Sequence, residues 1–508
     1  MSLSPVLLLT IIALHFLILL LISFQTSKGA KNETFFVADR NANWILVSYS
    51  MIGVVISGVT FMSVPGNVGG KGVNMAFYYL QFILGNVAGF YLISRVLLPI
   101  YYKMRVTSIY EYLRERLGVG SHQTGALFFL ISRQLGAAFR LYLMCLVLQE
   151  FVMAPFGIPF WATAFLLPTL IWIYTYNGGT KTIIVTDTLQ TTFFLSALII
   201  TFFSIASAMQ TNVFGLMGQI FQSAYAKTFY WEDWNNPSHF IKQFMGGLVT
   251  TIAMSGLDQD IMQKNLTCRN IKDAQKNMYT FTVVIFFVNV LFVMLGAALY
   301  LYAQSAGFTV PERTDKVFAF VAFNHLPIIV GILFLVGVMS ATYASSDSAL
   351  AALTTSFCVD FLHFTRQPSA SPEAEKQRER TRILVHIGFS VLTALIVIVF
   401  NELNDDAVVN KIFQIAGYTY GPLLGLFMFG LFTRQRIKDR YTLVVAAVAV
   451  ALAYTLDQNS AQWFNGFKFG FLTLSMNGLL MFTGLWLIRD RAAGLMPRDW
   501  HRAPSEPV

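Results

Sequence analysis

The amino-acid sequence predicts an all-α polytopic membrane protein with about thirteen transmembrane helices. Hydrophobic residues make up 56% of the 508 residues and charged residues only 12%, which is too little charge for the surface of a soluble chain of this length. Apolar runs such as 5–24 and 182–208 are long enough to cross a hydrocarbon core of about 30 Å, which takes roughly 20 helical residues. Lys and Arg crowd into alternate gaps between these runs, as they do in membrane proteins of fixed orientation.

Thirteen stretches are predicted to span the membrane, and an odd number places the two termini on opposite sides. The first stretch is not expected to be a cleaved signal peptide, because no charged side chain precedes it and Lys28, Lys31 and Arg40 follow it. The predicted spans are 5–24, 43–65, 73–100, 124–155, 158–176, 182–208, 240–263, 276–304, 327–364, 380–401, 408–432, 440–456 and 470–488.

The distribution of Lys and Arg predicts which side each terminus occupies. One alternate set of gaps carries 25 of the 35 basic residues and the other set carries 5. By the positive-inside rule the N-terminus is then outside and the C-terminus in the cytoplasm, as in a bacterial inner membrane. The net charge of +9 is spread over seven segments, so we expect no nucleic-acid partner. The basic gaps are 25–42, 101–123, 177–181, 264–276, 364–382, 433–440 and the C-terminal tail.

The sequence gives no sign of an enzyme. Its three cysteines, Cys145, Cys268 and Cys358, have no metal-ligand spacing and suggest no disulfide framework. No His/Asp metal cluster stands out, nor a nucleophile with a base beside it. A membrane sensor is disfavoured because no kinase or signalling domain follows Arg489.

Glycines and prolines interrupt several predicted spans. They free backbone groups that must find protein, water or ligand partners within a membrane. The pairs Ser57-Gly58 and Ser255-Gly256 each lie in the first helix of a possible five-helix unit, 43–208 and 240–432. Five is odd, so the second unit is inverted, an arrangement typical of secondary transporters whose sites lie at the breaks. Alternatively, each Ser-Gly pair only permits close helix packing.

Five chain regions follow from this division. We expect a leading helix and cytoplasmic linker, a first five-helix unit, an extracellular loop, a second and inverted unit, and two further helices with a cytoplasmic tail. Their respective bounds are 1–42, 43–208, 209–239, 240–432 and 433–508.

Acidic and hydroxyl side chains inside two spans are candidate cation ligands. Ionisable groups within a membrane are costly and usually functional. Asp187 lies in the sixth span, and Ser345, Ser346, Asp347 and Ser348 form a cluster in the ninth. Sodium prefers hydroxyl, carboxylate and carbonyl oxygens, which this cluster could supply opposite the broken second span. A hydrogen-bonded helix contact is the alternative.

Arg133 and Arg140 are seven residues apart in the fourth span, so two helical turns place them on one face. The pair could bind an anionic substrate through bidentate hydrogen bonds. It could equally neutralise Asp258, Asp260 or Glu150 inside the bundle.

Four motifs, in order along nearly the whole chain, resemble the sodium/solute symporter family. The resemblance implies sodium-coupled symport by a LeuT-like core of two inverted five-helix repeats, with one extra helix before and two after. The motifs are Arg105-x-Thr107-x-x-x-Glu111-Tyr-Leu-x-x-Arg116, Gly178-Gly179 with Thr186-Asp187-x-x-Gln190, Asp258-Gln259-x-x-x-Gln263-Lys264 and Gly417-x-x-x-Gly421-Pro422-x-x-Gly425.

The resemblance also implies two sodium sites. In the first, backbone oxygens of three residues and one hydroxyl bind the ion: Gly53, Ile56, Ala341 and Ser345. The family usually has a second hydroxyl where this chain has Ala344. The second site, present in some members, would use Asp187, with Asp347 and Ser348 at its hydroxyl positions.

The expected substrate positions depart from the sugar-transporting members. Thr60 and Tyr79 stand where galactose transporters have Gln and Glu, so a close sugar-transporter analogue is not expected. The two arginines favour a carboxylate-bearing solute, although internal pairing explains them equally well. The candidate pocket residues are Thr60, Tyr79, Arg133, Arg140, Asp258, Gln259, Gln414 and Tyr418.

The expected function is sodium-coupled import of a small polar solute by alternating access. Sodium is the expected coupling ion, and the solute and the lipid bilayer are the expected partners; the oligomeric state cannot be read from the sequence. A proton-coupled transporter of the same fold is the alternative, with Asp187 or Asp347 as the proton carrier. A channel or sensor, which needs no alternating access, is a more distant one.

Overall fold

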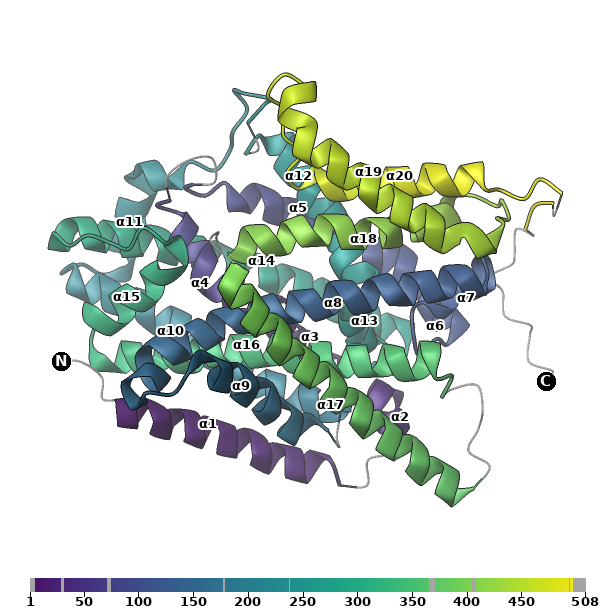
Figure 1. Cartoon of the computed structure of the whole chain (residues 1–508). Helices are drawn as coiled ribbons and strands as arrows, with labels where there is room; N and C mark the ends of the chain where they lie inside the picture. The colour runs from purple at the N-terminus through teal and green to yellow at the C-terminus, as the bar shows by residue number, and fades with distance from the viewer. Residues whose placement is uncertain are drawn as a thin grey trace.

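The computed structural model describes residues 5–28, 32–70, 75–176, 179–236, 238–364, 371–403, 408–492 and 494–496. These residues fold into a bundle of α-helices, with extended pairing limited to isolated bridges such as that of Ala42 with Cys268. Gly178 of the second motif lies outside the described residues. The bundle is drawn in Figure 1.

The long helices coincide with the predicted spans, and four short helices lie between them. The short ones are α2 (Asn32–Val37), α7 (Glu111–Arg116), α11 (Val213–Gln222) and α15 (Val317–Asn324). The helices within the predicted spans are α1 (Pro5–Thr26), α3 (Trp44–Val55), α4 (Gly58–Asn67), α5 (Tyr79–Leu92), α6 (Leu98–Met104), α8 (Val119–Leu148), α9 (Phe160–Thr175), α10 (Gly179–Ala208), α12 (Phe240–Thr251), α13 (Gln259–Asn265), α14 (Ile271–Ala306), α16 (Ile328–Ser356), α17 (Pro372–Leu403), α18 (Val408–Phe432), α19 (Thr442–Trp463) and α20 (Leu472–Leu487).

The number of membrane crossings is smaller when only long apolar helices are counted. Over the described residues nine helices qualify, or ten if α3 and α4 form one bent span. The three remaining predicted spans coincide with α9, α20 and the interrupted pair α12 and α13. Because α9 and α20 have 16 residues each, they fall short of the roughly 20 that cross a bilayer without thinning it. The count of thirteen therefore stays a prediction.

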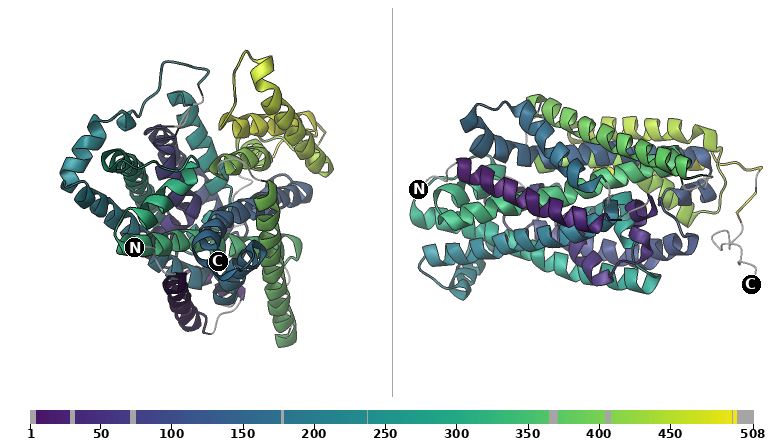
Figure 2. Two further views of the ribbon diagram at one scale, coloured as in Figure 1. Left: turned by 60° about the vertical axis from the view of Figure 1, so that its left-hand side comes forward. Right: turned by 90° about the horizontal axis from the view of Figure 1, so that it is seen from below.

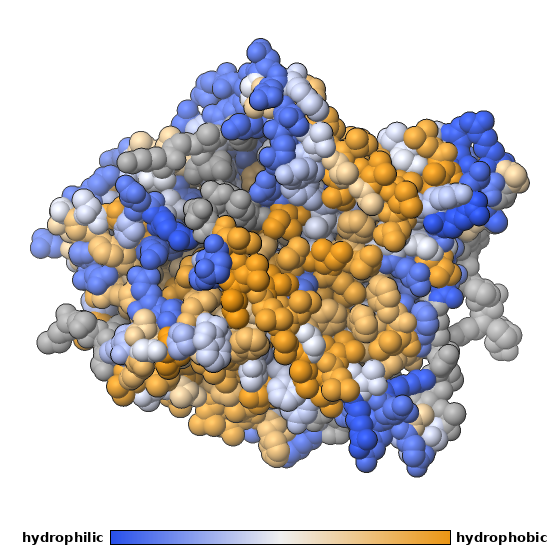
Figure 3. All heavy atoms as spheres, viewed as in Figure 1, coloured by the Kyte–Doolittle hydropathy of each residue, from blue (hydrophilic) through white to orange (hydrophobic). Residues whose placement is uncertain are grey.

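The surface of the bundle fits a lipid environment. A broad hydrophobic area covers the middle of the face shown in Figure 3, and hydrophilic residues gather towards its margins. Large apolar side chains on the outward faces of several helices are exposed, among them Phe203 of α10, Phe287 of α14 and Leu384 of α17. Such a large exposed apolar surface would be unfavourable in water and is expected in a membrane-embedded chain.

Five helices form the centre of the bundle. The central helix α16 packs against α8 and α10, while α8 also packs against α18 and α10 against α3. A second set of contacts joins α5 with α12, and α14 with α3, α4 and α5. The helices α1, α17, α19 and α20 lie at the periphery (Figure 2). The interior site is therefore enclosed by the chain itself.

Two helices are interrupted inside the bundle. The axes of α3 and α4 differ by 59° across Ile56 and Ser57, whose backbones are extended. The turn between α12 and α13 is a π-helical segment, Ile252–Gly256, followed by an extended Asp258. Both interruptions free main-chain groups from the helical ladder, as the glycines of the sequence predict.

Glycines bring α5 and α12 into backbone contact. A Cβ atom added to Gly85 would lie 2.0 Å from the carbonyl oxygen of Phe244. One added to Gly247 would lie 2.0 Å from the carbonyl oxygen of Phe82. Neither backbone can move aside easily, so only glycine fits at this crossing.

We predict that Gly85→Ala lowers the stability of the protein by about 1–3 kcal/mol, because the new methyl group forces α5 and α12 apart. The apparent melting temperature of the purified protein in detergent measures this effect. Gly388→Ala on α17 is the matched control, since nothing lies within 4 Å of a Cβ atom there. Equal melting temperatures for the two variants would contradict the close approach of the two backbones.

Candidate substrate pocket and cation cluster

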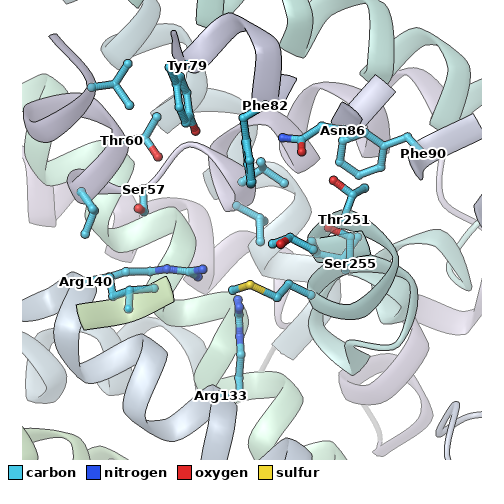
Figure 4. A pocket seen from close by; sticks show the side chains of 18 residues that line it. Ser57, Thr60, Tyr79, Phe82, Asn86, Phe90, Arg133, Arg140, Thr251 and Ser255 are labelled. Carbon is cyan, nitrogen blue, oxygen red and sulfur yellow. The ribbon is translucent and has the colours of Figure 1, made fainter. Parts of the chain in front are cut away.

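A pocket lies between the two helix interruptions, with about 840 Å³ of empty space counting its open side. Its walls come from α3, α4, α5, α8, α12 and the start of α18 (Figure 4). Hydroxyl and amide groups that line it are those of Ser57, Thr60, Tyr79, Asn86, Thr251 and Ser255.

Both Ser-Gly pairs serve packing and the pocket together. Ser57 and Ser255 line the pocket, one from each interruption. A Cβ atom on Gly58 would lie 2.2 Å from Thr342 Oγ1, and one on Gly256 would lie 2.7 Å from a methyl of Leu97. The glycine of each pair thus allows close packing, and the serine beside it reaches the cavity.

The two arginines of α8 both point into the pocket but differ in their partners. Arg133 is 3% exposed and forms ion pairs with Asp260 and, at 3.8 Å, with Asp258. Among the residues that the structure describes, no carboxylate lies within ion-pair distance of Arg140, and its Nη1 has no hydrogen-bond partner. Arg133 is therefore paired directly within the protein, whereas Arg140 lines the cavity without a direct ion-pair partner among the described residues and interacts with Asp258 only at longer range.

Four of the predicted pocket residues lie elsewhere. Asp258 accepts a hydrogen bond from Tyr420 as well as pairing with Arg133. Gln259 of α13 donates to the carbonyl oxygen of Thr107, at 2.9 Å, and so joins α13 to the loop before α7. On α18, Gln414 is exposed, and Tyr418 donates to Asp457 of α19 at 2.6 Å. Asp258, Gln259 and Tyr418 thus hold neighbouring elements together, and a role in solute binding stays a prediction for all four residues.

The other predicted residues, Thr60, Tyr79, Arg133 and Arg140, all line the pocket. Sequence reasoning missed a second set of lining residues on α5. Phe82, Asn86 and Phe90 follow Tyr79 at helical spacing and share its face. A polar Asn at such a position in an apolar helix is a signal that could have revealed this face.

Gly53, one residue of the first predicted sodium site, lies where α3 packs against α16. A Cβ atom on Gly53 would lie 3.1 Å from the Cβ of Ala344, which places α3 directly beside α16. Ser345 is fully buried and donates to the carbonyl of Thr342 in its own helix, at 3.0 Å. Because the last carbonyls of a helix have no intrahelical partner, those of Gly53 and Ile56 are suited to bind a cation.

A buried charge cluster adjoins this position. Asp187 of α10 forms an ion pair with Lys264 of α13, and both side chains are almost completely buried. Ser50 of α3 accepts from Lys264 Nζ at 2.9 Å and donates to Asp187 at 3.3 Å. Sequence reasoning noted Lys264 only as part of a motif; its contact with Asp187 joins residues 77 positions apart and has no local signal.

The second carboxylate of the cluster is Asp347 of α16. It accepts from the hydroxyl of Tyr174 at 2.7 Å and from the backbone N–H of Ser348 at 2.5 Å. Asp347 lies close enough to Asp187 and Lys264 to interact with both electrostatically. The predicted second cation site therefore already contains one cation from the protein.

The contrast between the two arginines gives a stability prediction. Arg133→Gln leaves Asp258 and Asp260 without a cation, so we expect a loss of about 3–5 kcal/mol. Arg140→Gln removes a charge without an ion-pair partner, so the apparent melting temperature should stay near the wild-type value or rise. Thermal unfolding of both purified variants without solute makes this comparison. Similar losses in both variants would mean that Arg140 has an internal partner too.

The comparisons with known proteins all point to one family. The model of the sodium:solute symporter family matches residues 35–440. The sodium/sialic acid symporter SiaT of Proteus mirabilis is 26% identical over 87% of this chain and 88% of its own length. The sodium/sialic acid symporter NanT of Aliivibrio fischeri is 26% identical over 84% and 83%, respectively. The human sodium/iodide cotransporter is 23% identical over 79% and 61%.

Solved structures show the same fold. A Na⁺-coupled sialic acid symporter in a substrate-bound outward-open state superposes with a TM-score of 0.79, at 21% identity, over 94% of this chain and 97% of that one. Mhp1, a nucleobase-cation-symport-1 family transporter in a closed conformation, gives a TM-score of 0.53 at 14% identity over 90% and 93%. The all-helical bundle is thus that of LeuT-like transporters. The chain belongs to the sodium:solute symporter family, as an integral membrane transporter that couples solute transport to sodium.

Proposed function

We propose that this symporter imports a small carboxylate-bearing anion together with sodium, by alternating access. The guanidinium of Arg140, which lines the pocket without a direct ion-pair partner among the described residues, carries this proposal. A half-buried charge without a direct partner is costly, and an anionic solute supplies that partner. A planar guanidinium also matches a carboxylate geometrically, with two parallel hydrogen bonds.

The rest of the pocket and the relatives support this substrate class. Thr60 and Tyr79 offer hydroxyl groups to polar parts of a solute, and Phe82 and Phe90 offer apolar walls. The names of the relatives refer to sialic acid, iodide and monocarboxylates, all of which are anions at neutral pH. A neutral sugar would leave Arg140 unpaired.

The proposed sodium site consists of the Gly53, Ile56 and Ala341 carbonyls with the Ser345 hydroxyl. Its link to the pocket is short, because Ser57 follows Ile56 directly and lines the cavity. An ion that fixes the carbonyl of Ile56 also fixes the backbone that carries Ser57. Coupling requires sodium to bind the outward-open and inward-open states unequally, and a ligand set drawn from two helices allows this.

A second cation position is proposed at Asp187, Asp347 and Ser348. Since Lys264 already pairs with Asp187, the protein's own ammonium group occupies part of this position, and Asp347 is the carboxylate that has no ion-pair partner among the described residues. Either carboxylate could instead carry a proton, which keeps the proton-coupled transporter as the alternative function. Channel and sensor functions have no comparable support in the pocket.

The two five-helix units are proposed as inverted repeats at 43–208 and 240–432. Helix contacts support this division. If each helix is replaced by the corresponding helix of the other unit, the α8–α18 contact becomes the α16–α10 contact, and the α5–α12 contact becomes the α14–α3 contact; all four contacts are present. Each unit also begins with an interrupted helix. The segments 1–42, 209–239 and 433–508 would then be additions to this core.

The proposed orientation in a bacterial inner membrane has the N-terminus outside and the C-terminus in the cytoplasm. Helix α1 begins at one end of the bundle and α20 ends at the other, which supports opposite sides (Figure 1). Sodium entering the cell then moves down a potential whose contribution is about 2.3 kcal/mol per charge per 100 mV.

Thermal stability across a panel of carboxylates and neutral sugars tests the substrate class. Carboxylates that bind should raise the apparent melting temperature in sodium but not in potassium, by mass action. Arg140→Gln should abolish this shift, whereas Arg95→Gln, at an exposed position between α5 and α6 that does not line the pocket, should keep it. Stabilisation by neutral sugars in Arg140→Gln would refute the anion. A shift that ignores sodium and follows pH would favour proton coupling.

A second prediction concerns the proposed sodium site. Ser345→Ala removes one ligand oxygen, so the sodium concentration for half-maximal uptake should rise about tenfold, which corresponds to about 1.4 kcal/mol. Uptake of a carboxylate identified by the stability screen, in proteoliposomes, provides the measurement. Ser390→Ala is the control, because Ser390 is also buried and bonded within its helix, at 2.9 Å to His386. An unchanged sodium dependence in Ser345→Ala would remove this residue from the site.

A further inference from the structure

We infer that Lys264 is a built-in cation that occupies the Asp187 carboxylate in place of a second coupling sodium, so that the protein binds a single sodium ion. This inference rests on the proposed sodium site at the end of α3. It concerns how many ions the symporter uses, which the family membership leaves open.

The contacts of Lys264 bring three helices to one point. Its ammonium group, on α13, pairs with Asp187 of α10 and donates to Ser50 of α3. The Lys264 side chain is 1% exposed, and that of Asp187 is fully buried. A compact ammonium group with oxygen partners from two other helices has the surroundings that a bound sodium ion would have.

The Lys264 position adjoins the proposed sodium site. A Cβ atom on Gly53 would lie 3.6 Å from the backbone oxygen of Asp187 and 2.8 Å from Thr191 Oγ1, both of α10. Gly53 and Ser50 are also less than one helical turn apart on α3. The lysine and the sodium ion therefore act on the same part of α3.

Charge counting sets the number of external cations. With ionised side chains, Asp187 and Asp347 contribute two negative charges and Lys264 one positive charge. Tyr174 and Ser50, which bond to the carboxylates, are neutral. Buried charges must be balanced, so the cluster retains room for one further positive charge. A single sodium ion at the neighbouring site supplies it.

Two oxygens on the helices of the cluster are available to a second ion once the lysine is removed. Asp187 Oδ1 and Ser346 Oγ are buried and have no hydrogen-bond partner among the described residues. Both lie on helices that pack against each other, α10 and α16. Removing the ammonium group would add Asp187 Oδ2 to this set and leave two negative charges to balance.

Equilibrium binding of ²²Na⁺ to the purified protein tests the inference directly, without need of the solute. Wild type should bind one sodium per chain. Lys264→Met, with two uncompensated carboxylates, should bind two, and Lys264→Arg, which keeps the charge, should bind one. Lys242→Met is the matched control, because Lys242 is also buried but lies against the rings of Trp234 and Phe467, and it should bind one.

Two further variants protect the test against misfolding of Lys264→Met. Asp187→Asn leaves the cluster neutral, so its sodium affinity should fall at least tenfold. The double variant Lys264→Met/Asp187→Asn restores one net negative charge and should again bind one sodium with near wild-type affinity. If the ion pair is purely structural, these variants should differ in melting temperature, but the sodium affinity should not fall in Asp187→Asn and recover in the double variant.

The outcomes separate failure of the inference from failure of the proposed sodium site. Two sodium ions bound to wild type, or one bound to folded Lys264→Met, would overturn the role of Lys264 while the proposed site stands. Failure of the double variant to recover affinity lost in Asp187→Asn would also overturn it. A wild-type protein whose single sodium is unaffected by Ser345→Ala would refute the proposed site instead.

Discussion

The interruption between α3 and α4 is the constraint on which the rest of the site depends. Within a membrane, main-chain groups released from a helix must be satisfied by protein, water or ligand. Here the released groups lie at Gly53, Ile56 and Ser57, between the helix α16 and the pocket. In the proposed function, one local departure from helical geometry provides both the carbonyls for a cation and a hydroxyl for a solute. The glycine of the Ser57-Gly58 pair permits both by letting α4 approach Thr342.

Charge within the bundle is arranged in two ways. Arg133 and Lys264 each have a carboxylate from another helix and hold parts of the bundle together. Arg140, two helical turns along from Arg133 on the same face, has no such carboxylate within ion-pair distance among the described residues. Since breaking a buried ion pair is far more costly than removing a charge without a partner, the same residue type has a structural role at one position and is available for a ligand at the other.

The sequence predicts much of this architecture because hydropathy and helix-breaking residues act locally. Every predicted span contains a helix, and both main interruptions lie at the expected Ser-Gly pairs. Partner choice between distant helices is not local, so the sequence left open whether Arg133 or Arg140 was paired. For the same reason it grouped Gln259 and Tyr418 with the pocket, although Thr107 and Asp457 hold them elsewhere. Conversely, the helical spacing of the pocket-lining residues of α5 is a local signal that the sequence does contain: Tyr79, Phe82, Asn86 and Phe90.

The positions of the charges also suggest how ion and solute can depend on each other. The proposed sodium site and the Asp187–Lys264 pair both lie against α3, while ion pairs of Arg133 with Asp258 and Asp260 hold α8 to the second interrupted helix. The pocket lies between these two anchors, with residues from both interruptions in its walls. A cation bound on one side and an anion bound to Arg140 on the other both neutralise charge in the same small volume. A bound cation therefore lowers the electrostatic cost of bringing the two interrupted helices together around the anion, and a bound anion does the same for the cation. This reciprocal dependence is what symport requires.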